Sequence, residues 1–116
     1  MVVGNAEKQK KIEIDSSIAQ FTTMKVLVTE NEGWEDYVMR LVEVGEGGYT
    51  PKHSHPWEHI NFVTEGEGEI MIAGKINKVS KDAYAFIPPN TLHQFRNTGD
   101  AIFKFICIVP KRGHNI

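Results

Sequence analysis

Short apolar and β-branched segments, separated by turn residues about every ten positions, constrain the fold of this chain more than any other feature. The segments cover residues 25–29, 37–44, 59–66, 69–74, 83–90, 93–97 and 102–110. Turns rich in Gly, Pro or Asn lie between them, for example at residues 66–68, 88–90 and 98–100. No segment keeps the 3.6-residue apolar period of a helix. The pattern therefore predicts an all-β sandwich or barrel.

The chain has 116 residues, which predicts a single domain. The first twenty residues are weakly patterned, so we expect an N-terminal arm over residues 1–20 and a β-barrel domain over residues 21–116. A net charge of −2 gives no reason to expect nucleic acid or an anionic membrane as a partner. Because there is no secretory signal and Cys107 is the single cysteine, we expect a cytoplasmic protein.

Three of the five histidines lie within the stretch HSHPWEH, residues 53–59. On a helix, His55 and His59 would share a face, and HPWEH would match the H-x-x-E-H signature of inverzincin metalloproteases. Pro56 opposes this helix because it removes a hydrogen bond and clashes with the preceding turn. On a strand, His53 and His55 share a face with Cα atoms about 6.6 Å apart, and His59 opens the next strand. Three imidazoles can then converge on one ion.

The histidines and turns together resemble the two motifs of the cupin superfamily. The first motif, G-x5-H-x-H-x3,4-E-x6-G, is matched by Gly47, His53, His55, His59 and Gly66. The second motif, G-x5-P-x-G-x2-H-x3-N, is matched by Pro88, His93 and Asn97, with Asp82 and Asn90 at its two glycine positions. The resemblance covers residues 38–110 and implies a single-domain cupin-type β-barrel, a jelly roll of two antiparallel sheets.

His59 stands where most cupins have a glutamate ligand, which makes the chain similar to small single-domain cupins with an all-histidine site, often carrying manganese. Alternation along the strand points Glu58 outward. The resemblance implies one divalent ion per chain, with Mn or Fe favoured and Zn, Ni or Cu as alternatives. A tetrahedral zinc would be closed by four histidines and would be structural. The implied ligands of the mononuclear site are His53, His55, His59 and His93.

Strand alternation also predicts the lining of a substrate pocket. We expect Glu43 and Lys104 to face water, which turns the neighbouring positions on both strands inward. The resulting pocket residues are Arg40, Phe95, Phe105 and Cys107. We expect Arg40 to bind a carboxylate or enolate of the ligand or to form a salt bridge at the barrel rim. Cys107 is interpreted either as a small core residue or as a thiol that can be oxidised beside a redox metal.

If His59 faces inward, Ile60 and Phe62 face outward on the same strand. Outward apolar residues, together with the habit of the family, predict a homodimer. His114, in the C-terminal tail, is expected in solvent.

The resemblance implies a metal-dependent oxidoreductase of the dioxygenase kind that acts on a small apolar or aromatic molecule. A non-redox isomerase or lyase that uses the ion as a Lewis acid is the first alternative. A non-catalytic module that binds a small ligand is the second. The fold does not choose among them, because cupins carry all three.

Overall fold

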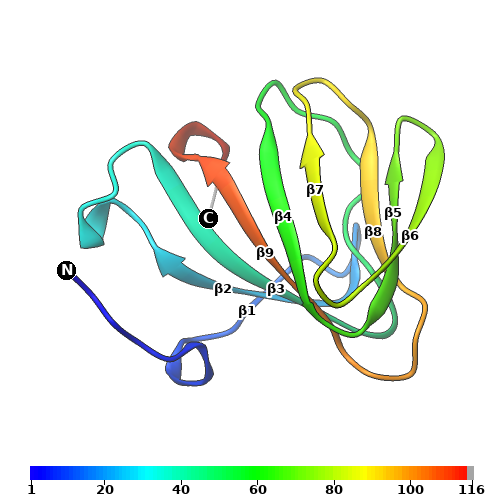
Figure 1. The fold of residues 1–116 in the computed structure, drawn as a ribbon, viewed down its shortest axis with the longest axis horizontal. Coiled ribbons are helices and arrows are strands. Elements are labelled where there is room, and N and C mark those ends of the chain that lie inside the picture. Colours follow the sequence, from blue (N-terminus) through cyan, green and yellow to red (C-terminus); the bar gives the residue numbers. More distant parts are fainter. Residues whose placement is uncertain (115–116) are drawn as a thin grey trace.

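A computed structural model describes residues 1–114, in which nine strands form an antiparallel sheet that curls on itself (Figure 1). The strands are β1 (Ile12–Glu13), β2 (Gln20–Val28), β3 (Tyr37–Tyr49), β4 (His59–Glu65), β5 (Glu67–Ile72), β6 (Lys75–Ser80), β7 (Tyr84–Ile87), β8 (His93–Asn97) and β9 (Phe103–Pro110). Three 3-10 turns are η1 (Ala6–Lys8), η2 (Glu30–Glu32) and η3 (Lys111–Gly113). The predicted all-β fold is confirmed. Within residues 1–114, no helix has the length and apolar character needed to cross a membrane.

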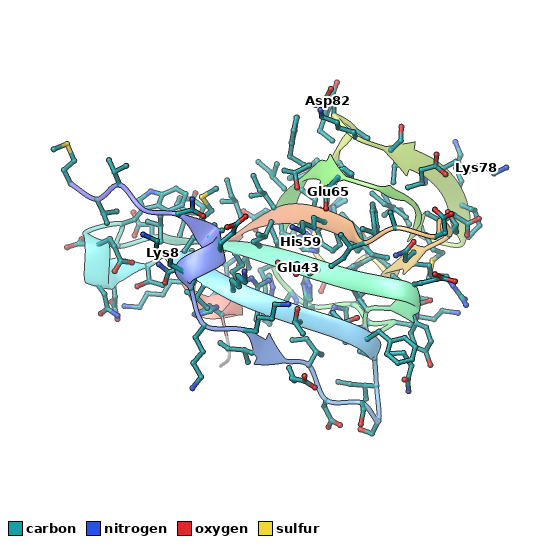
Figure 2. The ribbon with its side chains drawn as sticks, turned by 90° about the horizontal axis from the view of Figure 1, so that it is seen from below. Lys8, Glu43, His59, Glu65, Lys78 and Asp82 are labelled. Carbon is teal, nitrogen blue, oxygen red and sulfur yellow. The ribbon has the colours of Figure 1, made fainter. Side chains whose placement is uncertain are left out.

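The long strand β3 connects the two halves of the fold. The sheet order is β6-β5-β8-β3-β9-β4-β7, and β2 also pairs with β3. β3 pairs with β9 from Tyr37 to Val44, whereas its last residue, Tyr49, pairs with Arg96 of β8. This last pair joins the two sheets of the jelly roll into one curled sheet. Figure 2 shows His59 inside the curl, while Lys78 and Asp82 lie at its outer edge.

The start of β2 and the presence of β6 differ from the sequence prediction for local reasons. β2 begins at Gln20, five residues before the predicted start. Phe21 adopts a φ of 50°, and a register shift there interrupts the alternation of the strand. The alternating pattern of the sequence therefore does not reveal the first part of β2. β6 was not predicted at all. It forms a hairpin with β5 through Ala73 and Gly74, which both have positive φ, and Ala is an unusual residue for the first position of such a turn.

The core lies between the inner faces of β3 and β9 and the strands opposite them. Its largest fully buried side chains are Phe103, Ile70, Ile87, Val38, Val44, Val63, Val109 and Asn61. Alternation places Val38, Val42 and Val44 inward as predicted. Glu43 points to the other face, but the prediction that it faces water is wrong because only 5% of it is exposed. Lys11 of the N-terminal segment and Lys25 of β2 cover it, with Nζ to carboxylate distances of 3.7 and 3.6 Å.

Candidate metal centre

Backbone hydrogen bonds bring the histidines of the two motifs together. The amide of His53 donates to the carbonyl of His93 at 3.2 Å, and the amide of His93 donates back at 3.0 Å. The amide of Asn90 donates to the carbonyl of His55 at 2.7 Å. His59 is the first residue of β4. Because residues 50–58 contain no helix, the metalloprotease interpretation is wrong.

Two turns of the second motif keep their backbone shape without the glycines of the cupin pattern. Asp82 has a φ of 76° and Asn90 a φ of 60°, both in the left-handed region. Asn and Asp are the non-glycine residues that tolerate this region best. Asn90 therefore preserves the turn that presents His93, and Asp82 preserves the turn between β6 and β7.

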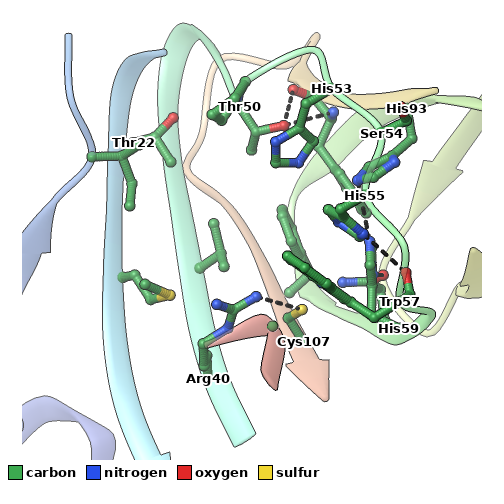
Figure 3. A pocket seen from close by; sticks show the side chains of 18 residues that line it. Thr22, Arg40, Thr50, His53, Ser54, His55, Trp57, His59, His93 and Cys107 are labelled. Carbon is green, nitrogen blue, oxygen red and sulfur yellow. Dashed lines mark hydrogen bonds between the residues drawn. The ribbon is translucent and has the colours of Figure 1, made fainter. Parts of the chain in front are cut away.

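The four histidines lie close together on one side of the cavity (Figure 3). Ligand nitrogens of His53, His55 and His93 lie within 4.8 Å of one another. Nε2 of His59 lies 3.2 Å from Nε2 of His93. Two nitrogens that each lie about 2.1 Å from one ion are roughly 3.0 to 3.4 Å apart, depending on the coordination shell. His53, His55 and His93 thus form a cluster that can hold a metal ion, with His59 beside it.

In three of these rings, a hydrogen bond at Nδ1 determines which ring nitrogen carries the proton. Nδ1 of His55 lies 2.9 Å from the carbonyl oxygen of Trp57, and Nδ1 of His93 lies 2.8 Å from that of Thr91. Nδ1 of His59 lies 2.6 Å from Oδ1 of Asn61. These oxygens only accept hydrogen bonds, so each Nδ1 carries the proton and each Nε2 keeps its lone pair.

Two facing lone pairs, on His59 and His93, repel each other at 3.2 Å unless a cation lies against both. The donor set therefore fits a metal ion. Burial, and to a smaller extent the charges of the neighbouring imidazoles, together lower the pKa of His53 and of His93 to about 4. Burial also lowers the pKa of His55 and His59. The rings are accordingly neutral at pH 7, as metal binding requires.

A cavity of about 470 Å³ opens beside the histidines. All four predicted pocket residues, Arg40, Phe95, Phe105 and Cys107, line it. Phe95 and Phe105 stack with ring centroids 4.2 Å apart. Arg40 donates from Nη2 to Sγ of Cys107 at 3.3 Å, and no salt bridge to Arg40 is found within residues 1–114. The wall is thus largely apolar, with one cationic group.

Several residues around the site were not singled out from the sequence. Asn61, which is 1% exposed, could have been found because it shares the inward parity of His59. Trp57 stacks on His55 with centroids 4.4 Å apart. Gly113 packs so closely on the indole of Trp57 that a Cβ would collide with it. No local sequence pattern predicts the contact between Gly113 and Trp57, because it depends on how η3 packs against the rest of the domain.

Two further expectations concern residues at the edge of the site. His114 was expected in solvent, which is wrong: it is half-buried, and its Nδ1 is buried without a hydrogen-bond partner. Burial lowers the pKa of His114, and the nearby charge of Arg40 lowers it further. Glu58 lies outside the histidine cluster, where its carboxylate is 3.6 Å from Arg112.

Comparison with known proteins places this geometry in a family. The uncharacterized protein MJ1618 of Methanocaldococcus jannaschii is 31% identical over 67 residues, which are 58% of this chain and 53% of that protein. The match therefore spans about half the length of this curated relative.

Several solved structures resemble this chain over most of its length. The polyketide cyclase RemF from Streptomyces resistomycificus superposes with a TM-score of 0.87 at 27% identity, covering 95% of this chain and 79% of the cyclase. A cupin-2 domain protein from Rhodospirillum rubrum gives 0.80 at 27% identity, with coverage of 90% and 69%. A predicted oxalate decarboxylase from Thermotoga maritima gives 0.84 at 18% identity, with coverage of 94% and 98%, and so shares the fold. Residues 40–109, more than half of the chain, match the cupin domain, and the chain belongs to the cupin family.

Proposed function

We propose that this protein is a metal-dependent oxidoreductase of the dioxygenase kind that acts on a small apolar or aromatic molecule. The observation that carries the proposal is the histidine cluster, whose neutral Nε2 atoms converge beside a largely apolar cavity. His53, His55, His59 and His93 would hold one divalent ion per chain. Mn or Fe is favoured, and Zn, Ni or Cu are the alternatives.

When bound, the ion would supply Lewis acidity and, for Mn or Fe, one-electron redox chemistry. The residues of the chain orient and enclose the reactants. Trp57, Asn61 and Thr91 hold the imidazoles through Nδ1, while Phe95 and Phe105 offer an aromatic wall that excludes water. Among the described residues, those lining the cavity include no Asp or Glu. The cavity therefore lacks a carboxylate base, which favours redox chemistry over proton abstraction.

Oxygen uptake tests this proposal directly. Protein loaded with Mn or Fe should consume O₂ when a small aromatic probe, such as a catechol, or a 1,3-diketone is added. The His93→Ala variant should not, and the His114→Ala variant should retain uptake because His114 is not a proposed ligand. Turnover of a probe without O₂ consumption would refute the oxidoreductase assignment.

A non-redox metalloenzyme is the second candidate. The similarity to RemF, described as a polyketide cyclase, favours it, since 95% of this chain aligns with that protein at 27% identity. In this case the protein would convert its substrate under argon as fast as in air. Zinc would then support activity as well as manganese does. A protein that binds probes but never turns them over would instead be a binding module.

We further propose a homodimer formed through the outer face of β4 and β7. Ile60 pairs with Phe86 and Phe62 with Tyr84, and these four side chains are 52%, 57%, 40% and 81% exposed. Such a row of exposed apolar side chains is typical of a protein contact surface. The buried, unpaired Cys107 fits a reducing compartment, and we propose a cytoplasmic location.

A further inference from the structure

The guanidinium of Arg40 has no anionic partner although it lies in the wall of the cavity. Five ion pairs are found among residues 1–114, and none includes Arg40. Its Nη2 donates to Sγ of Cys107, the residue directly opposite on β9. Its Nε is buried and has no hydrogen-bond partner within the described residues. A permanently charged group with five donors is thus served by one weak acceptor.

Leaving the guanidinium of Arg40 with so few acceptors costs free energy unless a ligand supplies further acceptors. Arg40 is half-buried with its Nε fully buried, so its guanidinium loses part of its hydration and gains little from a thiol in return. A buried polar atom without a partner in a native structure calls for a specific explanation, and a missing ligand is one. The flat fork of the guanidinium matches a carboxylate, which can accept two parallel hydrogen bonds.

The surroundings of Arg40 indicate the rest of the ligand. In Figure 3, Arg40 and Cys107 lie toward one end of the cavity, and His53 and His93 toward the other. The wall of the cavity includes the stacked pair Phe95 and Phe105. No acidic side chain of the described residues lines this space to repel an anion.

We propose that Arg40 is a carboxylate-binding residue, so that the cavity takes a small aromatic or apolar acid in preference to the neutral molecule of the same shape. This deepens the proposed function, on which it rests for the identity of the cavity as the substrate site. Arg40 would hold the carboxylate, and the aromatic wall would hold the body of the ligand. The part of the ligand remote from the carboxylate would then extend toward the histidines.

Calorimetric titration with benzoate and with benzamide, its neutral analogue of similar shape, tests this inference at about pH 8, where ordinary imidazoles are neutral. The wild-type protein should prefer benzoate by roughly 10- to 100-fold, the range expected for hydrogen bonds to a charged group. Arg40→Gln should remove the preference, because it weakens the binding of benzoate far more than the binding of benzamide. Arg40→Lys should retain part of it, which also keeps the test valid if Arg40→Gln does not fold.

The matched control is Arg96→Gln. Arg96 is exposed on β8 over the ring of Tyr49, so this change alters the net charge equally without entering the cavity. It should leave the preference for benzoate intact. All variants should keep the metal content of the wild type.

A bound metal ion could also attract a carboxylate, so the titrations are repeated on protein stripped with a chelator. Preference that persists without metal, and disappears in Arg40→Gln, supports the proposal. Preference that disappears on chelation but survives Arg40→Gln would overturn it, as would failure of the wild-type protein to bind benzoate. These outcomes are independent of O₂ uptake, so the carboxylate site and the oxidoreductase assignment can fail separately.

Discussion

The two faces of β4 differ sharply in burial and in polarity. His59 and Asn61 point inward and are 5% and 1% exposed, whereas Ile60 and Phe62 point outward and are 52% and 40% exposed. Over residues 59–62 the usual order of a half-buried strand is therefore inverted, with polar residues inside and apolar residues outside, whereas the next inward residue, Val63, belongs to the apolar core.

Each face is stable for its own reason. The inner polar groups satisfy one another, since Asn61 accepts from His59 and donates to the carbonyl of Ile106 at 3.4 Å. The outer apolar residues have no cover within residues 1–114, and an assembly would provide it. The comparison teaches that the two faces of this strand meet different surroundings, with a hydrogen-bonded polar cluster on the inner face and uncovered apolar side chains on the outer face.

The largest expected effect is on the inner face, through the loss of a histidine. His93→Ala removes one imidazole and its Nε2 contact with His59, so metal content should fall from about one ion per chain to near zero. The loss of affinity should exceed the 10- to 100-fold typical for changes to outer partners alone. Metal analysis after dialysis measures it, with His114→Ala as the control that should bind normally. Full occupancy in His59→Ala, together with loss in Glu58→Ala, would show that the ligand assignment is wrong.

The next effect tests whether Asn61 is a positioning residue for His59. Asn61→Leu fits an apolar interior but removes the acceptor for His59 Nδ1, so metal affinity should fall by roughly 10- to 100-fold. Asn61→Asp keeps an acceptor at that place and should retain most of the affinity. Competition with a chelator gives the constants. Equal affinities in Asn61→Leu and wild type would assign Asn61 to packing alone.

The outer face gives a smaller, structural effect. Ile60→Lys combined with Phe62→Lys places charges in the proposed dimer contact, where they lose hydration, so the mass in solution should halve. Light scattering at micromolar concentration measures it. Metal content should stay unchanged, because both residues point away from the cluster. A monomeric wild-type protein, or a dimer indifferent to both substitutions, would falsify the proposed assembly.

A separate expected effect is a pH dependence of the metal-free protein. His53 and His93 have pKa values of about 4 in the folded chain and 6.5 as the ordinary value, so the unfolded chain takes up protons first as the pH falls. Folding stability should be fully present above pH 6.5 and decline as the pH falls to about 4. Urea midpoints across this range measure it. The His53→Gln/His93→Gln double variant should show a flatter dependence, whereas Ile60→Ser should follow the wild type.

The sequence alone could predict the features that depend on local pattern. Alternation and turn residues predicted β3, β4, β8 and β9, and β8 was placed over residues 93–97 as observed. The same alternation turned Phe103, Phe105 and Cys107 inward. The spacing of the histidines, with the cupin resemblance, predicted the cluster. These features follow from the two-residue period of a strand, which needs no knowledge of partners.

What could not be predicted depends on contacts between distant segments. The burial of Glu43 required knowing that Lys11 folds over it. The partial burial of His114 required the path of the C-terminal turn. The alternation along a strand predicts which face of the sheet a side chain occupies, but it does not predict which distant segment covers that face.

The stacking of Trp57 on His55 gives the protein a built-in optical probe. The indole lies in face-to-face contact with a proposed ligand, and the close packing of Gly113 against it holds it in place. An ion with unpaired electrons at the cluster should quench its fluorescence, whereas zinc should not. Trp34 is the other indole, beside Tyr37 and partly exposed, and Trp34→Phe would leave a single emitter. Titrations of metal and ligand could then be followed by light, without labels.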